Sequence, residues 1–373
     1  MQFIDLQSQY KCLKDKIDAR IHTVLDHGKY IMGPEVTELE EELANYLGVK
    51  HAITCANGTD ALQLALMAMG IGSGDAVIIP PFTFFATAES VSIVGAEPVF
   101  SDIAPKTYNL CPIELEKTIV KYMAHGRKTL KAVMAVDLFG LPANYPEIIA
   151  LCHKYKLLLI EDGAQGFGGS INGRKACTFG DISTTSFFPA KPLGSYGDGG
   201  AIFTDNDEYA DILKSLRIHG KGGHKYDNVR IGMNSRLDTI QAAILLEKLA
   251  VFDNEILARN MIASKYTNAF ETKLTSPVVL DKFKSAWAQY SISSENIDRN
   301  HIMEKLKEKG IPSNVYYPQG LHLSGAMKNL NYQKGDFPVT ENTTQSIFSL
   351  PMHPYLKEVD QNVIIDNMLE IIK

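Results

Sequence analysis

The 373-residue chain is long enough for one large domain and a smaller one. Its 37 basic and 43 acidic residues give a net charge of -6, which offers no electrostatic reason to bind nucleic acid or an anionic membrane surface. Five scattered cysteines without a CxxC pair favour a reducing cytoplasm over a zinc site, and no metal is expected. The polar start of the chain and the absence of a long apolar run predict a cytoplasmic protein without a membrane span.

Short apolar runs alternate with helical patterns from about residue 50 to about residue 205. Runs that are apolar on both faces and separated by helices indicate a largely parallel sheet covered on both sides. We therefore expect an α/β domain here. The predicted strands lie at 51–55, 76–80, 97–100, 131–136, 157–162, 182–188 and 200–204.

Residues 235–270 have helical periodicity without an internal proline or glycine, which predicts one or two long helices leading out of this domain. We place a boundary near residue 250, giving a large domain at 1–250 and a smaller one at 251–373. The smaller domain is expected to contain a strand and two helices, at 286–294, 298–310 and 358–373.

The segment 56–70 follows a predicted strand and opens a helix at Gly58, Thr59 and Asp60. Free backbone N–H groups, a glycine that permits close approach and a threonine hydroxyl together suit a phosphate. The helix dipole contributes only about 0.3–1 kcal/mol, so further donors would be needed. A simple helix cap formed by Asn57 to Asp60 is the alternative.

Glu161 and Asp162 end the most apolar predicted strand. Ligands bind at the carboxyl ends of strands in open α/β sheets, and a carboxylate there can keep a ring nitrogen protonated. Aromatic residues in PFTFFATAES (81–90) follow another strand and are placed to cover a flat cofactor. A capped loop and ordinary core packing are the respective alternatives. The glycine-rich segment 70–75 leads from a helix into a strand, so it is a turn and not a dinucleotide fingerprint.

Lys191 stands in SFFPAKPLG (186–194), between two prolines and after two phenylalanines. Burying an ammonium is unfavourable, so this residue is either a surface lysine or a reactive amine. A phosphate cradle, a carboxylate, a stacking ring and a lysine are the groups that pyridoxal phosphate requires. A partly desolvated amine has a lowered pKa and becomes nucleophilic. We therefore expect Lys191 to be a Schiff-base lysine.

Further motifs extend along nearly the whole chain. They are FIDL (3–6), GPEV (33–36), NGTDAL (57–62), EDGAQ (161–165), SFFPAKPLG (186–194), GDGGAIFTD (197–205), NSRLDTIQAAIL (234–245) and SLPMHPYL (349–356). Together they resemble the DegT/DnrJ/EryC1/StrS sugar aminotransferases of the aspartate-aminotransferase fold. The resemblance implies a fold type I enzyme, with a mostly parallel sheet in the large domain and a smaller α+β C-terminal domain.

The resemblance also implies roles for individual residues. Lys191 would hold pyridoxal 5'-phosphate, with pyridoxamine phosphate as the intermediate form, and Asp162 would pair with the ring nitrogen. Gln165 would approach the ring hydroxyl, and Phe84 would stack on the ring. The phosphate would be held by Gly58, Thr59 and Ser186.

Two residues of the NSR motif are implied to serve a shared site. Asn234 would reach the neighbouring subunit's cofactor, which implies a homodimer, and Arg236 would lie close to the nucleotide sugar. The loop HGKGGHKY (219–226) would help to cover the partner's site, with a plain surface loop as the alternative. His219 and His224 lack a third ligand, so they do not indicate a metal site.

The motifs look most similar to enzymes that aminate C3 of UDP-2-acetamido-2-deoxy-3-oxo-glucuronate for lipopolysaccharide O-antigen and other bacterial surface polysaccharides. L-Glutamate would be the amino donor and 2-oxoglutarate the product. Arg236 would pair with the uronate carboxylate, and Tyr316 and Tyr317 are expected substrate contacts, although a His-Tyr pair is frequent there. Amination at C4 of a UDP- or dTDP-linked 4-keto-6-deoxy sugar is the alternative. Retention of Lys191 argues against related dehydratases, and the lack of a basic patch argues against a DNA-binding regulator.

Overall fold

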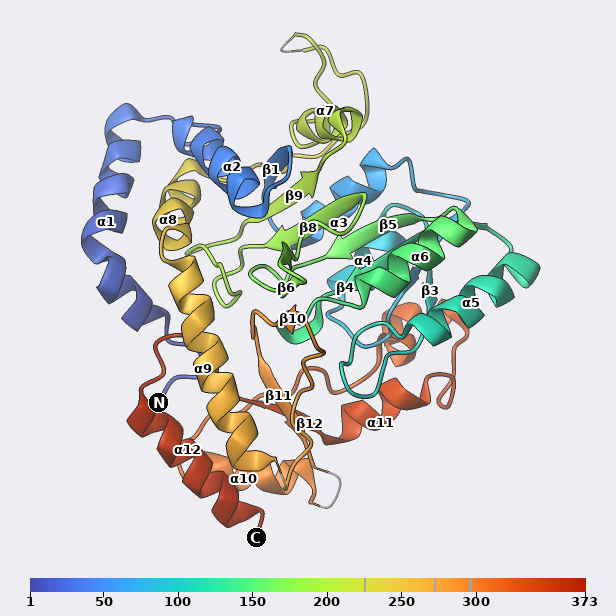
Figure 1. Ribbon diagram of the computed structural model, residues 1–373. Coiled ribbons are helices and arrows are strands. Elements are labelled where there is room, and N and C mark those ends of the chain that lie inside the picture. The colour runs from blue at the N-terminus through green and yellow to red at the C-terminus, as the bar shows by residue number, and fades with distance from the viewer. Residues whose placement is uncertain (225, 272, 295–296) are drawn as a thin grey trace.

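The computed structural model describes residues 1–373 except 225, 272, 295 and 296. A seven-stranded sheet forms the centre of its larger part, in the order β1-β9-β8-β5-β4-β2-β3 (Figure 1). The strands from β8 to β3 are parallel, whereas β9 is antiparallel to both β8 and β1. The strands are β1 (His51–Cys55), β2 (Asp75–Ile79), β3 (Glu97–Phe100), β4 (Thr129–Val136), β5 (Leu158–Asp162), β8 (Ile182–Ser186) and β9 (Gly200–Thr204).

Each predicted apolar run forms one of these strands, so the expected α/β sheet is confirmed. The run at 182–188 is shorter than expected, because the strand ends at Ser186. Phe187 packs in the core and Phe188 is exposed. The chain therefore leaves the sheet just before the loop that carries Lys191.

Successive side chains in a strand point to opposite faces, and the central strands accordingly contribute to two hydrophobic clusters. Ile78 and Val133 pack with α5 and α6 on one face. Val77 and Ala132 pack with α3 and α4 on the other. These helices are α3 (Gly58–Ala68), α4 (Ala86–Ile93), α5 (Pro112–His125) and α6 (Tyr145–Tyr155).

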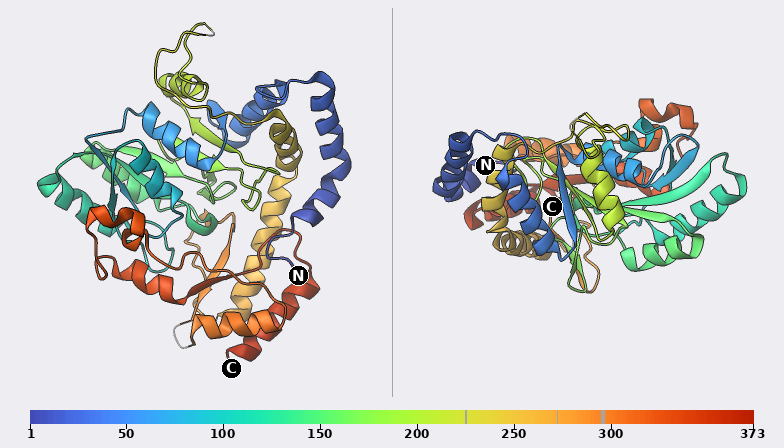
Figure 2. Two further views of the ribbon diagram at one scale, coloured as in Figure 1. Left: turned by 180° about the vertical axis from the view of Figure 1, so that it is seen from behind. Right: turned by 90° about the horizontal axis from the view of Figure 1, so that it is seen from above.

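Four further helices lie around the β1 side of the sheet. Figures 1 and 2 show α1 beside α8 at one edge of the molecule, where Leu13 and Ile17 pack with Ile244. Leu39 of α2 packs in a common cluster with Leu245 of α8. The four helices are α1 (Leu6–His27), α2 (Pro34–Leu47), α7 (Asp207–Leu216) and α8 (Thr239–Leu249).

The long helix α9 leads from the central sheet into a second structural unit, and a hydrophobic cluster joins it to two strands and two helices there. The expected strand at 286–294 is limited to β11, while both expected helices are present. The elements are α9 (Phe252–Phe270), β11 (Tyr290–Ser293), α10 (Arg299–Glu308), β12 (Ile347–Leu350) and α12 (Glu358–Ile371). A small sheet contains β6 (Ser170–Ile171), β7 (Arg174–Lys175) and β10 (Phe283–Lys284).

Part of the C-terminal half packs back on the central sheet. Leu321 lies in the same cluster as Val77, and the Val339 and Thr340 amides donate to Asp102 at 3.0 and 3.1 Å. The division near residue 250 falls between α8 and α9 and stays a prediction. This segment contains the short helices η2 (Leu321–Leu323) and η3 (Gly325–Leu330) and the helix α11 (Pro338–Ser346). Among the described residues, no helix is long and apolar enough to cross a membrane.

Candidate active site

Lys191 lies in the loop after β8, where its amide donates to the Phe188 carbonyl at 2.8 Å. In the described part of the chain, its side-chain Nζ has no hydrogen-bond partner. Burial lowers the pKa of the Lys191 amine, and the nearby Asp162 carboxylate opposes that shift. The site therefore holds an amine that is easier to deprotonate than a surface lysine and is not engaged by the protein.

Asp162 ends β5 and is almost fully buried. Thr87 Oγ1 donates to its Oδ2 at 2.9 Å, and the Ala164 amide donates to its Oδ1 at 3.3 Å. Burial raises the pKa of Asp162, while Thr87, Ala164 and the Lys191 charge act in the opposite direction. Two donors and the Lys191 charge thus partly offset the effect of burial on this carboxyl group.

Glu161 was predicted to share this strand end with Asp162, but its side chain is engaged elsewhere. Its carboxylate accepts the amides of Cys177 at 2.5 Å and Phe179 at 2.7 Å, and the Ser183 hydroxyl at 2.7 Å. Neighbouring residues in a strand face opposite sides of the sheet. Of these two strand-end residues, Asp162 therefore supplies the carboxylate of the site.

Gln165 links three segments that are distant in sequence. Its Oε1 accepts the Phe139 amide at 2.7 Å, and its Nε2 donates to the Tyr317 hydroxyl at 3.2 Å. The Tyr317 ring lies 6.4 Å from the ring of Phe84, which is exposed. Tyr316 is half-buried, with its ring 6.3 Å from that of Phe3. These contacts bring Gln165, Phe84 and both tyrosines together.

The N-terminus of α3 lies against the end of β8. A Cβ added to Gly58 would stand 2.7 Å from Ser186 Cβ, and one on Gly200 would stand 2.6 Å from the Asn57 backbone. The two glycines therefore permit an approach that a side chain would prevent. Asn57 caps the helix by accepting the Asp60 amide at 2.8 Å, which leaves the first turn, with Gly58 and Thr59, facing the Ser186 end of the strand.

The NSR motif lies next to this helix, because Ser235 Oγ accepts the Ala56 amide at 3.1 Å. Asn234 is exposed and accepts a hydrogen bond from the half-buried Arg236. In Figures 1 and 2 the segment after α7 projects from the molecule, with residues 219–224 and 226 of the predicted covering loop. Residue 225 of that loop lies outside the described residues.

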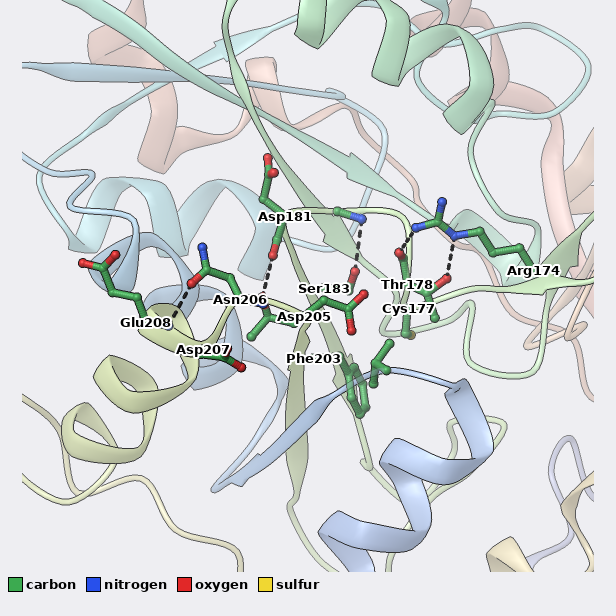
Figure 3. Close-up of a pocket in the computed structure, with 13 residues that line it drawn as sticks. Arg174, Cys177, Thr178, Asp181, Ser183, Phe203, Asp205, Asn206, Asp207 and Glu208 are labelled. Carbon is green, nitrogen blue, oxygen red and sulfur yellow. Dashed lines mark hydrogen bonds between the residues drawn. The ribbon is translucent and has the colours of Figure 1, made fainter.

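A cavity of about 590 Å³ lies at the opposite edge of the sheet, where β8 begins and β9 ends (Figure 3). Several of its polar groups are bonded within the chain: Arg174 Nε donates to Thr178 Oγ1 at 3.1 Å, and Asn206 accepts the Glu208 amide at 2.8 Å. The predicted site residues, all of which the structure describes, are absent from its lining. The chemistry-bearing residues gather instead at the carboxyl edge of β5 and β8.

Sequence reasoning did not identify Thr87 or Phe139 as supports of the site. Thr87 lies in the aromatic segment after β2, and its contact with Asp162 joins residues 75 positions apart. The Phe139 amide, in the short helix η1 (Leu138–Gly140), fixes the Gln165 side chain. A backbone donor has no sequence signal, and a single threonine has only a weak one.

The assembled residues fit pyridoxal phosphate. Lys191 supplies an unengaged amine and Asp162 a buried carboxylate, while the α3 N-terminus beside Ser186 provides backbone donors suited to a phosphate. The exposed Phe84 supplies an aromatic face.

Residues 11–369 match the model of the DegT/DnrJ/EryC1/StrS aminotransferase family, and the chain belongs to this family. The UDP-2-acetamido-2-deoxy-3-oxo-D-glucuronate aminotransferase of Pseudomonas aeruginosa is 45% identical over 365 residues, covering 98% of each chain. A DegT DnrJ EryC1 StrS aminotransferase from Brucella abortus has a TM-score of 0.97 at 51% identity and covers 100% of this chain and 99% of that chain. S. venezuelae DesV, solved in complex with a ketimine intermediate, has a TM-score of 0.94 at 35% identity, with coverage of 99% and 97%.

The predicted family and fold type are thus confirmed. The protein is an aminotransferase, and its cofactor is pyridoxal phosphate.

Proposed function

We propose that the protein transfers an amino group from L-glutamate to C3 of UDP-2-acetamido-2-deoxy-3-oxo-glucuronate, in the biosynthesis of a bacterial surface polysaccharide. The assignment of the substrate rests on the 45% identity, over nearly the full length of both chains, to a protein named for that reaction. The chemistry is supported by an amine at Lys191 that nothing in the described chain engages, close to the buried Asp162.

When bound, pyridoxal phosphate supplies the carbonyl carbon for the amino group and a ring that accepts electrons. In the proposed site, Lys191 Nζ would hold the cofactor, and the same amine would be the base that moves the proton of the substrate carbon. The Asp162 carboxylate keeps the ring nitrogen protonated, and Gln165 Nε2 is available to the ring hydroxyl. Phe84 covers one face of the ring.

The cofactor phosphate is assigned to the first turn of α3 and the end of β8. The backbone N–H groups of Gly58 and Thr59 have no intrahelical acceptor, because they lie in the first turn of the helix. The Thr59 and Ser186 hydroxyls are further donors for a phosphate. The packing of Gly58 on Ser186 supports this assignment, because it brings the two groups of donors close together.

A homodimer with shared active sites is part of the proposal. Asn234 is exposed, and the projecting segment that precedes it carries exposed apolar side chains, with Val229 56% and Ile231 88% exposed. Large exposed apolar side chains close together mark an interaction surface. In the proposed dimer, Asn234 and the loop 219–226 complete the partner's site.

Arg236, Tyr316 and Tyr317 are proposed to contact the nucleotide sugar, with Arg236 on the uronate carboxylate. A guanidinium binds a carboxylate through two parallel hydrogen bonds, which a neutral hexose cannot accept. The five free cysteines of the described chain are in keeping with a cytoplasmic location.

A half-reaction screen tests the regiochemistry. The protein loaded with pyridoxamine phosphate is offered 3-keto and 4-keto nucleotide sugars, each with and without a C6 carboxylate. We expect the 3-keto uronate to restore the visible absorbance of the pyridoxal form fastest. Restoration by a 4-keto sugar alone would replace C3 amination with C4 amination. Separately, L-glutamate should bleach the pyridoxal form, and an unchanged spectrum would reject the amino donor.

The Arg236→Ala variant tests the carboxylate contact. We expect KM for the uronate to rise by about 10- to 100-fold, since a hydrogen bond to a charged group contributes about 1.5–3 kcal/mol. KM for the neutral hexose analogue should change little. Equal losses for the two substrates would remove Arg236 as the partner of the carboxylate.

A further inference from the structure

Two buried carboxyl groups lie on the side of β5 that faces away from the site. Glu161 is paired in register with Ala135 of β4, and Asp137 follows two residues after Ala135. Residues two apart in an extended chain share a face, so Asp137 and Glu161 are diagonal neighbours. Both side chains are completely buried, and each carboxyl group affects the pKa of the other.

The two carboxyl groups differ in the donors that surround them. Both oxygens of Glu161 accept hydrogen bonds, three in all, from Cys177, Phe179 and Ser183. For Asp137, Oδ1 accepts the Ala143 amide at 3.0 Å and the Tyr145 hydroxyl at 2.7 Å.

The second Asp137 oxygen, Oδ2, has no donor within the described residues. Donors favour an ionised carboxyl, and a bare buried oxygen favours a protonated one.

We propose that Asp137 and Glu161 share a single proton, which Asp137 Oδ2 carries and donates to Glu161, and that this pair positions the loop holding Asp162 and Gln165. Two carboxylates in contact and out of water cannot both be ionised without a large electrostatic penalty. A single proton turns this repulsion into a charge-assisted hydrogen bond.

The loop 163–166 rests directly on the pair. The Asp137 amide donates to the Asp162 carbonyl at 3.0 Å. A Cβ added to Gly166 would stand 2.2 Å from Asp137 Oδ2, and one on Gly163 would stand 2.4 Å from Cys177 Sγ. Gly166 brings the backbone of the loop against Asp137, and Gly163 brings it against Cys177, whose amide binds Glu161. Asp137 and Glu161 therefore act on the site as positioning residues.

The titratable groups facing the pair are consistent with one negative charge. Burial and the Glu161 charge raise the pKa of Asp137, whereas the pKa of Glu161 is raised by burial but opposed by its donors, including Asp137. Burial also raises the pKa values of Tyr145 from α6 and Cys177 from the segment after β7, so both stay neutral.

Reciprocal isosteric variants locate the proton. In Asp137→Asn, the amide can donate to Glu161 while its oxygen still accepts from Ala143 and Tyr145, so we expect an unchanged or higher melting temperature. In Glu161→Gln, an NH2 group faces existing donors, so the melting temperature should fall by several degrees. The opposite order would place the proton on Glu161, and a fall in both variants would reject a proton held by Asp137.

A matched control is Asp102→Asn. Asp102 is similarly buried, but its oxygens accept the amides of Val339 and Thr340 and the Thr340 hydroxyl. We expect this variant to lose stability, because its new NH2 group faces donors. If Asp102→Asn were tolerated as well as Asp137→Asn, tolerance at Asp137 would no longer indicate a proton there.

The pH dependence gives a second measurement that needs only the Asp137→Asn variant. A carboxyl whose pKa is raised on folding contributes stability at low pH that is lost as the pH rises toward its folded value. The melting temperature of Asp137→Asn minus that of the wild type should therefore increase as the pH rises. A difference that does not change with pH would overturn the proposal.

Two spectroscopic readouts separate positioning from bulk stability. The infrared spectrum should contain a deuterium-sensitive C=O stretch of a buried protonated carboxyl that disappears in Asp137→Asn. In the holoenzyme, Asp137→Ala should shift the pH titration of the cofactor's visible absorbance, and Asp137→Asn should restore the wild-type profile. A wild-type titration in Asp137→Ala would reject the positioning role, while leaving the proposed aminotransfer reaction intact.

Discussion

The loop after β8 and the helix α8 each carry a lysine whose amine is desolvated by burial, and the two lysines have different surroundings. Lys248 is buried, donates to the Gly194 carbonyl, and has its Nζ 4.8 Å from the centre of the Tyr196 ring. The Lys191 side-chain Nζ has no hydrogen-bond partner in the described part of the chain and lies near the Asp162 carboxylate.

Burial lowers the pKa of both amines, for Lys248 to about 8. Desolvation alone therefore does not distinguish a reactive lysine from a structural one. The distinguishing feature is that the Lys191 amine is left unengaged at a strand end that offers a carboxylate and phosphate donors.

Replacing Lys191 should have the largest effect on activity. Lys191→Ala removes both the attachment of the cofactor and the base that moves the proton, and general acid–base catalysis alone contributes about 100- to 10,000-fold. We expect at least that loss in the rate of the glutamate half-reaction, measured by stopped-flow absorbance. Wild-type rates in this variant would make Lys191 no more important than Lys248.

Neutralising Asp162 should have the next largest effect. A carboxylate beside a cation shifts the pKa of its partner by about one to three units, so Asp162→Asn should slow the half-reaction at neutral pH by about 10- to 1000-fold. Asp181→Asn is the control, because Asp181 accepts the Leu159 amide at the other end of the sheet. Comparable losses in both variants would show that the charge near Lys191 has no special role.

The Thr87 hydroxyl should have a smaller, pH-dependent effect. A hydrogen bond to a charged acceptor contributes about 1.5–3 kcal/mol, so Thr87→Val should raise the pKa of Asp162 by about one to two units. Asp162 would then be neutral at a higher pH, and the acid limb of the pH–rate profile should move toward neutral pH. Thr87→Ser keeps the hydroxyl and should retain the wild-type profile; identical profiles for the two variants would dismiss the contact.

Lys248→Met should affect stability and leave the half-reaction nearly unchanged. Burial lowers the pKa of Lys248 to about 8, below the value of about 10.4 in the unfolded chain. Below pH 8 the folded protein therefore holds a charged, buried amine, which lowers its stability. Through this group, wild-type stability rises between these two pH values. The melting temperature of the wild type minus that of Lys248→Met should therefore increase over this pH range. A constant difference would contradict the lowered pKa.

Much of the fold and the centre of the site could be predicted from the sequence, because the signals are local. Apolar runs on both faces marked the strands, and the lysine between two prolines stood out. The orientation of Glu161 was missed, although strand alternation places neighbouring residues on opposite faces. The contact of Gln165 with Tyr317 joins residues 152 positions apart, and the support of the loop by Asp137 depends on the register of β4 and β5. Such contacts depend on tertiary packing, which periodicity does not encode.

The most direct measurement maps the covalent bond between the protein and its cofactor. Borohydride is added to the holoenzyme, the protein is digested, and the peptide that has gained the mass of reduced pyridoxal phosphate is sequenced by mass spectrometry. The proposed site predicts that the modified residue is Lys191 and that Lys248 is unmodified. Attachment at another lysine, or no attached cofactor in a protein that shows the visible absorbance of bound pyridoxal phosphate, would contradict it.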